Sequence, residues 1–334
     1  MPKRLGIGVV GLDHWYTVFG VLDEASKGSG LKLVAVADSS RRRLAEIKRE
    51  YDPDLLTTDY RKVIDNPDVD IVCSLTNTRD NVKVARAALQ AGKHVACVKP
   101  MTMTLRQADA LIEIAERKRL VLWCFDQLAQ AQAASLKPLL ARGAIGQPIS
   151  FHQVAWSGLP RPWRGKTGAS WWVDENLVPF GAWADHAIYT IAMLRSLFEA
   201  EVETAYGEIA NKRYPKMKLE DYGVGTLRLS NGLIAVLEHT WTGGPYYPHW
   251  TKIIGTKGVI HMDQTVSDGQ PMLATPKGIR PVKLKRSKGG MLAPFLALVR
   301  DGAAKPSPAR ESRTNLAAAF AVYKAAKVGK YVKL

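Results

Sequence analysis

The sequence has few of the features that mark secreted, metal-binding or membrane-spanning proteins. Its three cysteines, Cys73, Cys97 and Cys124, each lie inside an apolar run typical of a strand. They are expected to be small buried side chains, which excludes a disulfide framework and a cysteine zinc site. No apolar run approaches the ~20 residues that cross a bilayer, and the first residues lead into a strand rather than a signal peptide. We therefore expect a cytoplasmic protein with no metal and no membrane contact.

The sequence also lacks a helix-turn-helix, zinc-finger or RNA-binding signature, although its formal net charge is +16. A positive potential favours anionic ligands by steering. The basic residues are nevertheless dispersed, with small clusters at Arg41–Arg43 and around Lys285. A solvated basic surface is the better interpretation, and no nucleic-acid partner is expected.

The first part of the chain alternates short apolar runs with helix-length stretches. The apolar runs cover residues 5–11, 31–37, 69–75, 94–98 and 120–125, and the helical stretches cover 14–27, 41–51, 81–91 and 105–118. Strands that are apolar throughout and alternate with helices are typical of a parallel sheet covered on both faces. We predict an α/β fold whose first domain, residues 1–125, is a Rossmann-type doubly wound parallel sheet.

The pattern changes after Gln127. A helix is predicted over 129–142, followed by strand-like runs over 149–155, 202–209, 222–229, 233–240, 251–255 and 259–262. Asn231-Gly232 between two of these runs is a hairpin turn signal. The second domain, residues 126–334, is therefore expected to be α+β, with a large, mostly antiparallel open sheet and a closing helix over 313–328.

The run that ends at Gly11 opens a helix, where the pyrophosphate of a dinucleotide would rest on free N–H groups. In the usual GxGxxG fingerprint the second and third glycines would stand where this chain has Asp13 and Tyr16. An aspartate is unfavourable beside a pyrophosphate, and a tyrosine would obstruct helix–strand packing. Asp13 is equally expected as the N-cap of the helix. The cofactor-binding candidates of this loop are Gly11, Leu12, Asp13 and His14.

Asp38, at the end of the second apolar run, is a better placed cofactor residue. Its carboxylate would accept hydrogen bonds from a ribose diol and repel a 2′-phosphate. Ser39 beside it and the following arginines, with Arg42 as the candidate, leave a 2′-phosphate site open. We expect NAD in preference to NADP.

A lysine stands directly before a proline at Lys99-Pro100, after the apolar run 94–98. An ammonium held on a proline-stiffened turn at the carboxyl end of a strand can reach a bound cofactor and polarise a substrate hydroxyl. Lys99 is therefore a candidate for both catalysis and cofactor binding.

These segments together resemble a known family. The motifs are Ala88–Val95 leading into Lys99-Pro100, Gly143–Gly146, Trp163-Arg164, Gly255–Gly258 and Ala321–Ala326. With them the chain resembles the Gfo/Idh/MocA family, which includes glucose–fructose oxidoreductase and inositol dehydrogenase, over nearly its whole length. The resemblance implies NAD(P)-linked oxidation or reduction of sugars, cyclitols and related polyols. It also implies homodimers or homotetramers formed through the open sheet face.

The second signature of the family, D-x-G-x-H-x-x-D, fits best with Asp185 on the first aspartate. Tyr189 then takes the histidine position and Ala192 the last aspartate. Asp185 and Tyr189 are four residues apart and would share one face of a helix. By this resemblance Tyr189 is the acid–base residue, activated by a nearby lysine, and Asp185 orients the pair or the substrate. His186 is the histidine of an alternative register, or a hydrogen-bonded helix residue.

Several positions around the cofactor depart from the family pattern. Val98 stands where glutamate precedes the lysine, and Asn77, Asn81 and Gln127 stand where proline, histidine and arginine are usual. Asparagines can still hydrogen-bond a ribose. The resemblance therefore extends the set of cofactor-binding candidates to Thr76, Asn77, Asn81, Gln127, Trp163 and Arg164.

Aromatic residues concentrate in the second half of the chain, above all between Trp241 and Trp250. Tryptophan faces suit the C–H faces of sugar rings, and the polar candidates for hydroxyls or a carboxylate are Arg161, Arg164, Tyr246, His239 and His249. The alternative is that several of these rings pack in the core or in a subunit interface. For Trp171-Trp172 the core or interface is preferred.

The leading hypothesis is an NAD(P)-dependent oxidoreductase acting on a sugar, sugar acid or cyclitol. Two alternatives keep the fold. One is a relative that holds its nucleotide permanently and uses transient oxidation of the substrate for glycoside cleavage or for an elimination reaction. The other is a non-catalytic sugar-binding or partner-binding relative, motivated by Asp13, Tyr16 and Val98.

Overall fold

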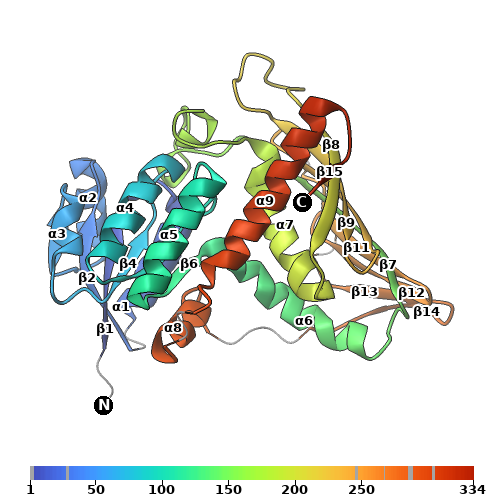
Figure 1. The fold of residues 1–334 in the computed structure, drawn as a ribbon, viewed down its shortest axis with the longest axis horizontal. Coiled ribbons are helices and arrows are strands. Elements are labelled where there is room, and N and C mark those ends of the chain that lie inside the picture. Colours follow the sequence, from blue (N-terminus) through green and yellow to red (C-terminus); the bar gives the residue numbers. More distant parts are fainter. Residues whose placement is uncertain (1–3, 28–29, 245–246, 267, 285–288, 303–304) are drawn as a thin grey trace. The chain divides into compact units, whose positions relative to one another are not determined.

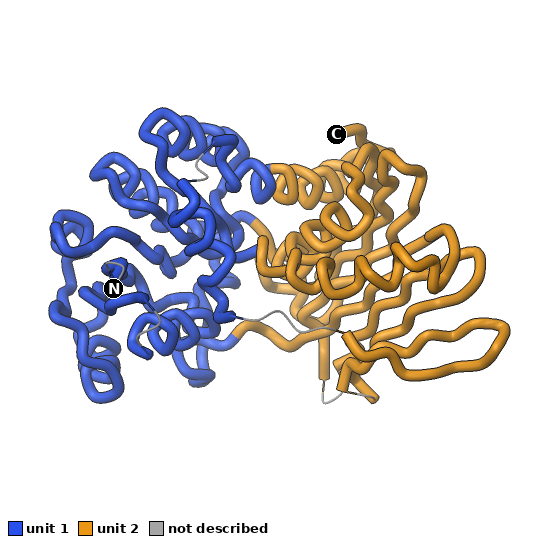
Figure 2. Tube along the Cα trace, turned by 90° about the horizontal axis from the view of Figure 1, so that it is seen from below, with its two compact units in different colours: residues 1–126, 161–179, 288–313 blue, residues 127–160, 180–287, 314–334 orange. Residues whose placement is uncertain are grey.

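A computed structural model of the chain describes residues 4–27, 30–244, 247–266, 268–284, 289–302 and 305–334. The chain forms two compact units, coloured separately in Figure 2. Unit 1 comprises residues 1–126, 161–179 and 288–313, and unit 2 comprises 127–160, 180–287 and 314–334. The segments 161–179 and 288–313 were expected in the second domain. They join unit 1 because their side chains bond to it, as Arg310 does to Glu116 at 2.6 Å.

Unit 1 is built on a parallel sheet with strand order β3-β2-β1-β4-β5-β6. Its strands are β1 (Leu5–Val10), β2 (Leu31–Ala37), β3 (Leu55–Thr57), β4 (Ile71–Ser74), β5 (His94–Cys97) and β6 (Leu122–Cys124). The strand order reverses between β1 and β4, and the crevice at such a reversal is the usual ligand site of a doubly wound sheet. The predicted Rossmann-type sheet is confirmed.

Helices α1 to α5 of unit 1 each follow one of its strands, whereas α8 comes later in the chain, after the strands of unit 2 up to residue 281 (Figure 1). They are α1 (Trp15–Ser26), α2 (Arg41–Glu50), α3 (Tyr60–Ile64), α4 (Thr78–Gln90), α5 (Leu105–Lys118) and α8 (Ala293–Arg300). Local sequence sets their starts: Ser40 and Asn77 cap α2 and α4, and Thr104 with Gln107 forms a capping box at α5. These side chains satisfy backbone N–H groups that have no partner within the helix.

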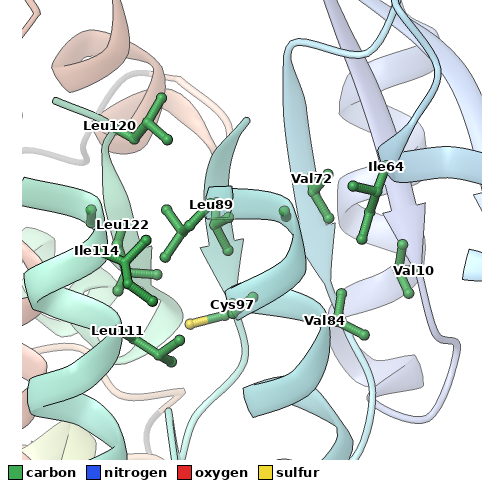
Figure 3. Packing of buried hydrophobic residues seen from close by; sticks show 14 of the residues in the cluster. Val10, Ile64, Val72, Val84, Leu89, Cys97, Leu111, Ile114, Leu120 and Leu122 are labelled. Carbon is green, nitrogen blue, oxygen red and sulfur yellow. The ribbon is translucent and has the colours of Figure 1, made fainter. Parts of the chain in front are cut away.

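The core of unit 1 lies between the sheet and helices α4 and α5 (Figure 3). Labelled residues include Val72, Leu89, Cys97, Leu111 and Leu122, from strands and helices alike. All three cysteines are buried and free, as the sequence predicts. Burial raises the pKa of the Cys73 thiol, so it packs as a neutral apolar group.

Unit 2 is built on a nine-stranded sheet with order β14-β13-β12-β11-β7-β10-β9-β8-β15. Its strands are β7 (Pro148–Trp156), β8 (Val202–Ala210), β9 (Tyr222–Leu229), β10 (Ile234–Thr240), β11 (His249–Gly255), β12 (Gly258–Asp263), β13 (Met272–Thr275), β14 (Gly278–Pro281) and β15 (Val332–Lys333). The pair β7 and β10 is parallel, whereas the other pairs are antiparallel. The predicted large, mostly antiparallel sheet is confirmed.

Helices α6 (Ala129–Ala141), α7 (Ala182–Phe198) and α9 (Ala309–Val328) accompany this sheet. The Trp183 ring of α7 lies directly on Gly223 and Gly225 of β9, where any β-carbon would collide with it. These glycines therefore let α7 pack close to the sheet.

Several short elements were not predicted from the sequence, namely β3, β13, β14, β15, α3 and α8. All four residues of β14 are exposed, so no buried face produces an alternating pattern there. Helix α9 begins at Ala309 rather than at 313; its residues up to 313 belong to unit 1, where Ser312 donates to Asp126 at 2.6 Å. Among the described residues, no helix is long and apolar enough to cross a membrane.

Candidate functional site

A cavity of about 260 Å³ opens at the carboxyl ends of β1, β2 and β4. It is lined by Val10, Gly11, Asp13, Ala37, Asp38, Ser39, Thr58, Tyr60, Thr76, Asp80, Lys83 and Val84. Five of the residues predicted to bind cofactor are in this lining: Gly11, Asp13, Asp38, Ser39 and Thr76. The cavity therefore lies at the reversal point where the fold class places a nucleotide.

Gly11 and Asp38 form the floor of the cavity. Gly11 has φ of +85°, and a β-carbon on it would lie 2.8 Å from the Thr76 backbone nitrogen, so only glycine fits. The Asp38 carboxylate accepts from Leu12 N at 2.9 Å and from Ser40 N at 2.8 Å. Burial raises the pKa of Asp38, and these hydrogen bonds oppose the rise. The loop is thus shaped by a carboxylate that also faces the cavity.

Asp13, in the loop after β1, is bonded to the first turn of α2 and to the loop after β4, at the carboxyl edge of the sheet. Its carboxylate accepts from Arg43 Nη1 at 2.8 Å and from the backbone and side-chain nitrogens of Asn77 at 3.2 and 3.4 Å. Arg43 follows β2 and Asn77 follows β4, on either side of β1. The Asp13 charge is therefore paired with a cation.

Two expectations for the fingerprint positions were wrong. The N-cap of α1 is His14, whose side chain makes no capping bond, whereas Asp13 turns towards Arg43 and Asn77. Tyr16 does not obstruct helix–strand packing, because it is 49% exposed and α1 packs through neighbours such as Val18 and Val21.

The structure brings Arg43 rather than Arg42 to the cofactor loop. The Arg42 side chain is 71% exposed and lies 4.0 Å from Glu46, whereas Arg43 lies 2.8 Å from Asp13 and 3.6 Å from Asp38. Helical period could have found this, since Arg43 is four residues before the buried Ile47.

The two asparagines stabilise loops. Asn77 caps α4, accepting from Asp80 N at 3.0 Å. Asn81 is fully buried and donates to the Met101 carbonyl at 2.8 Å, and its side-chain oxygen has no hydrogen-bond partner among the residues that the structure describes. Asn81 does not line the cavity; it supports the turn that carries Lys99.

Lys99 lies just beyond β5 and is 4% exposed, before a cis peptide bond to Pro100. Its Nζ lies 4.5 Å from the centroid of the Trp172 ring. The Trp172 ring in turn stacks on Trp171 at 4.3 Å and lies 5.8 Å from the His14 ring. An aromatic face stabilises an ammonium while excluding water from it. The core position expected for Trp172 is confirmed by its 2% exposure.

The segment 161–179, which contributes these tryptophans, is bonded to the start of α1 and to the C-terminal half of α2. The Arg161 carbonyl accepts from Trp15 Nε1 at 3.0 Å, and Trp171 Nε1 donates to the Asp13 carbonyl at 3.0 Å. Trp163 Nε1 donates to Glu46 at 2.7 Å, and Arg164 forms an ion pair with Glu50. The indole of Trp163 and the guanidinium of Arg164, predicted to bind cofactor, are thus paired with carboxylates of α2.

On α7 of unit 2, three side chains of the second family signature share one exposed face. Within the described stretch 181–195, Asp185, His186 and Tyr189 are partly exposed and all other residues are buried. Their spacing of one and four residues puts them on the same side of the helix. The structure therefore brings together the three catalytic candidates of this helix.

Neighbouring side chains hold this face in place. Trp241 Nε1 donates to Asp185 Oδ2 at 3.0 Å, and the Ser157 hydroxyl lies 3.1 Å from His186 Nε2. His186 Nε2 also lies 3.5 Å from Asp185 Oδ2. These contacts set the orientation of the Asp185 carboxylate and the His186 ring.

The start of α7 is capped by two residues from elsewhere in unit 2. The Glu220 carboxylate accepts from Gly181 N and Trp183 N, both at 3.0 Å, and the Glu220 carbonyl accepts from Ala182 N at 3.0 Å. The Tyr323 hydroxyl lies 2.6 Å from Glu220 and 3.3 Å from Ala184 N. Burial raises the pKa of Glu220, an effect that the Tyr323 hydroxyl opposes. Local sequence patterns contain no signal for these distant caps.

The predicted substrate residues have different fates. His239 is fully buried, where it lies 3.2 Å from the Gln153 side-chain oxygen, so the expectation that it binds a substrate hydroxyl was wrong. His249 is partly exposed at the start of β11, and Arg161 belongs to unit 1. Tyr246 lies outside the described residues, and Gln127 is buried in a short 3₁₀ helix after β6.

Among the described residues, no cluster of three or more His, Cys, Asp or Glu could hold a metal.

Two family models match the chain. Residues 5–125 match the oxidoreductase family, NAD-binding Rossmann fold, and residues 133–261 match the GFO/IDH/MocA C-terminal domain. Together they cover both units of the chain in large part, and they agree with the position of the cavity in unit 1.

Relatives agree with these matches. Myo-inositol 2-dehydrogenase of Thermotoga maritima is 27% identical over 77% of this chain and 75% of its own length. The 1,5-anhydro-D-fructose reductase of Ensifer adhaerens is 26% identical over 93% of each chain. Among solved structures, levoglucosan dehydrogenase in complex with NADH and levoglucosan has a TM-score of 0.83 at 22% identity, covering 99% of each chain. Aldose-aldose oxidoreductase of Caulobacter crescentus has a TM-score of 0.83 at 21% identity, covering 99% of this chain and 100% of that one.

The expectation drawn from the sequence motifs is thereby confirmed. The chain belongs to the Gfo/Idh/MocA family and is an oxidoreductase with an NAD-binding Rossmann domain.

Proposed function

We propose that the protein transfers a hydride between a nicotinamide nucleotide and the CH–OH or carbonyl carbon of a sugar, sugar acid or cyclitol. The observation that carries the proposal is the combination, at the carboxyl edge of one sheet, of the cavity lined by Gly11 and Asp38 and the buried Lys99. A cation held there without water suits binding of the oxygen that gains or loses charge.

The cavity fits the adenosine end of NAD. Gly11 leaves room for close approach, Asp38 offers a carboxylate for a ribose diol, and Val10, Ala37 and Val84 supply an apolar wall. When bound, NAD supplies the hydride acceptor, which the protein side chains lack. We favour NAD over NADP because two carboxylates, Asp13 and Asp38, face this cavity.

Each catalytic candidate has a role that its surroundings support. Lys99 would polarise the reacting oxygen, with the Trp172 face excluding water. Tyr189 would act as acid and base, and Asp185, oriented by the Trp241 indole, would position the substrate hydroxyls. His186, held by Ser157, is the alternative acid–base residue on the same helix face. His249 and Arg161 remain proposed substrate residues, as does Tyr246.

The names of the relatives support the proposed substrate class. These names include myo-inositol, levoglucosan and 1,5-anhydro-D-fructose, all polyhydroxylated rings or their ketones. A ring carrying several hydroxyls is the kind of substrate that the polar face of α7 can bind by hydrogen bonds. We further propose a cytoplasmic homodimer or homotetramer, formed through one face of the sheet of unit 2. Along β9 and β10 buried residues alternate with residues that are at least partly exposed, and the exposed ones form this face.

Titration with NADH and NADPH, followed by quenching of tryptophan fluorescence, tests the cofactor. Activity is then measured with NAD and a panel of inositols, anhydrosugars and aldoses, in the wild type and in Lys99→Met. We expect NADH binding by both proteins and roughly 10²- to 10⁴-fold slower turnover in the variant. Failure of the wild type to bind either nucleotide would contradict the proposal.

A second candidate function is chemistry on a permanently held nucleotide. It is favoured by the segment 161–179, which bonds to the glycine loop through Trp171 and to α1 through Arg161, and so would slow nucleotide release. Release of nucleotide from the purified protein on denaturation, with no turnover of added NAD, would support this candidate over the first.

A further inference from the structure

We propose that Asp13 sets the preference of the cavity for NAD(H) over NADP(H), because it engages the Arg43 guanidinium that a 2′-phosphate would otherwise bind. The inference rests on the proposed function, since it requires a nicotinamide nucleotide in this cavity. Asp13 stands at the position of the second fingerprint glycine, so its carboxylate is an addition of this chain to the glycine loop.

The position of Arg43 is set by three groups. Its Nη1 lies 2.8 Å from Asp13 Oδ1 and 3.6 Å from Asp38 Oδ2. Its guanidinium carbon lies 5.5 Å from the centroid of the Trp163 ring. The side chain is 24% exposed, so it is held beside the cavity rather than in bulk water. An arginine beside the ribose carboxylate is suited to bind a 2′-phosphate.

The charge balance disfavours that phosphate as the chain stands. Two carboxylates, those of Asp13 and Asp38, face one guanidinium, which leaves an excess of negative charge. A phosphate monoester adds about two further negative charges at neutral pH. Asp13 therefore acts in two ways, by occupying the donors of Arg43 and by adding a repulsive charge. A glycine in its place would leave Arg43 with Asp38 alone, at the longer distance.

Asp13 also has a structural role, which determines the choice of variant. It accepts hydrogen bonds from the Asn77 backbone and side chain at 3.2 and 3.4 Å. Asp13→Asn retains an acceptor oxygen for the bond from the Asn77 backbone, removes the charge, and replaces the oxygen that accepts from Arg43 with an NH2 group. Asp13→Gly restores the fingerprint residue and serves if the asparagine variant fails to fold.

The experiment measures the dissociation constants of NADH and NADPH for the full chain by tryptophan fluorescence at fixed salt. We expect Asp13→Asn to shift the ratio of the two constants towards NADPH by on the order of tenfold. The double variant Asp13→Asn/Arg43→Gln should lose this gain, because the gain depends on the released guanidinium.

Asp80→Asn is the matched control. It removes the same charge from the same cavity wall, but Asp80 pairs with Lys83 at 3.1 Å and with Arg79 at 3.4 Å rather than with Arg43. Its ratio should change by less than about threefold, and the change should be the same with Arg43→Gln. The inference about Asp13 is overturned if the ratio for Asp13→Asn equals that of the control, or if the gain in NADPH binding survives in the double variant. Neither result contradicts the proposed function. A wild type that binds neither nucleotide overturns the proposed function as well.

Discussion

The starts of α1 in unit 1 and α7 in unit 2 each have an acidic residue close by. One of these carboxylates caps the nearby helix and the other does not. Asp13, directly before α1, turns away from its own helix and pairs with Arg43 and Asn77. Glu220, distant in sequence from α7, satisfies the N–H groups of its first residues together with Tyr323. A helix start without a side-chain cap suits a ligand, whereas a start closed by protein groups suits a rigid platform.

The largest expected effect is at the closed start of α7. Glu220→Ala leaves buried N–H groups of Gly181 and Trp183 without acceptors, at a cost on the order of 3 kcal/mol in unfolding free energy. Urea unfolding measures the loss. Glu208→Ala, on the exposed side of β8, is the control and should change stability by less than about 0.5 kcal/mol. Equal effects of the two variants would show that the cap contributes little.

The next effect concerns the open start of α1. Gly11→Ala places a β-carbon against Thr76 at φ of +85°, whereas Gly92→Ala places one in open space at φ of +81°. The control should lose about 1 kcal/mol from the backbone conformation alone. Gly11→Ala should lose about twice that and bind NADH at least tenfold more weakly. Urea unfolding and NADH titration check both, and matching results for the two variants would remove the special role of Gly11.

A smaller effect is the pH dependence of unit 2. Burial lowers the pKa of His239 well below its ordinary value of 6.5. Its ring stacks on Trp183, in the first turn of α7, at 5.5 Å. The unfolded chain binds a proton here below about pH 6.5 and the folded chain does not, so stability falls as the pH decreases.

The measurement compares unfolding free energies at about pH 7.5 and pH 5. The wild type should lose ~1 to 2 kcal/mol more than His239→Gln between these values. His94, whose pKa is also lowered by burial, lies in unit 1 and provides the comparison between the units. An identical pH dependence of wild type and His239→Gln would contradict the assignment.

The smallest effect is at the surface of α1. The Tyr16 hydroxyl accepts from Arg161 N at 2.7 Å and donates to the Arg161 carbonyl at 3.1 Å. Tyr16→Phe should cost less than about 1 kcal/mol, because the contact is exposed. It should nevertheless speed proteolysis within 161–179, measured by mass spectrometry of a limited digest. Unchanged cleavage would mean that the other contacts of the segment, such as those of Trp163 and Trp171, hold it without the Tyr16 hydroxyl.

Local patterns in the sequence predict much of the fold. Apolar runs alternating with helices indicate the parallel sheet because each strand is buried on both faces. The position of Lys99 follows from the strand before it, and the shared face of Asp185 and Tyr189 follows from helical spacing. Residue type and period are sufficient for these predictions, since each depends on neighbours a few positions away.

The partners of the site residues could not be predicted in the same way. Asp13 was expected to cap its helix, and Arg42 was chosen where the structure uses Arg43. The membership of 161–179 in unit 1 depends on bonds such as that of Trp171 to Asp13, made across more than a hundred residues. Nothing local distinguishes a tryptophan that covers a glycine loop from one in a sheet core.

Sequence patterns were sufficient to predict the two sheets, the family, the glycine turn after β1 and the lysine just beyond β5. The folded chain was needed to show that Arg43 neutralises Asp13 and that Glu220 and Tyr323 cap the start of α7. The reason is physical. Secondary structure follows from periodic burial and local hydrogen bonding, whereas ion pairs and distant caps depend on where the folded chain brings two remote residues within about 3 Å of each other.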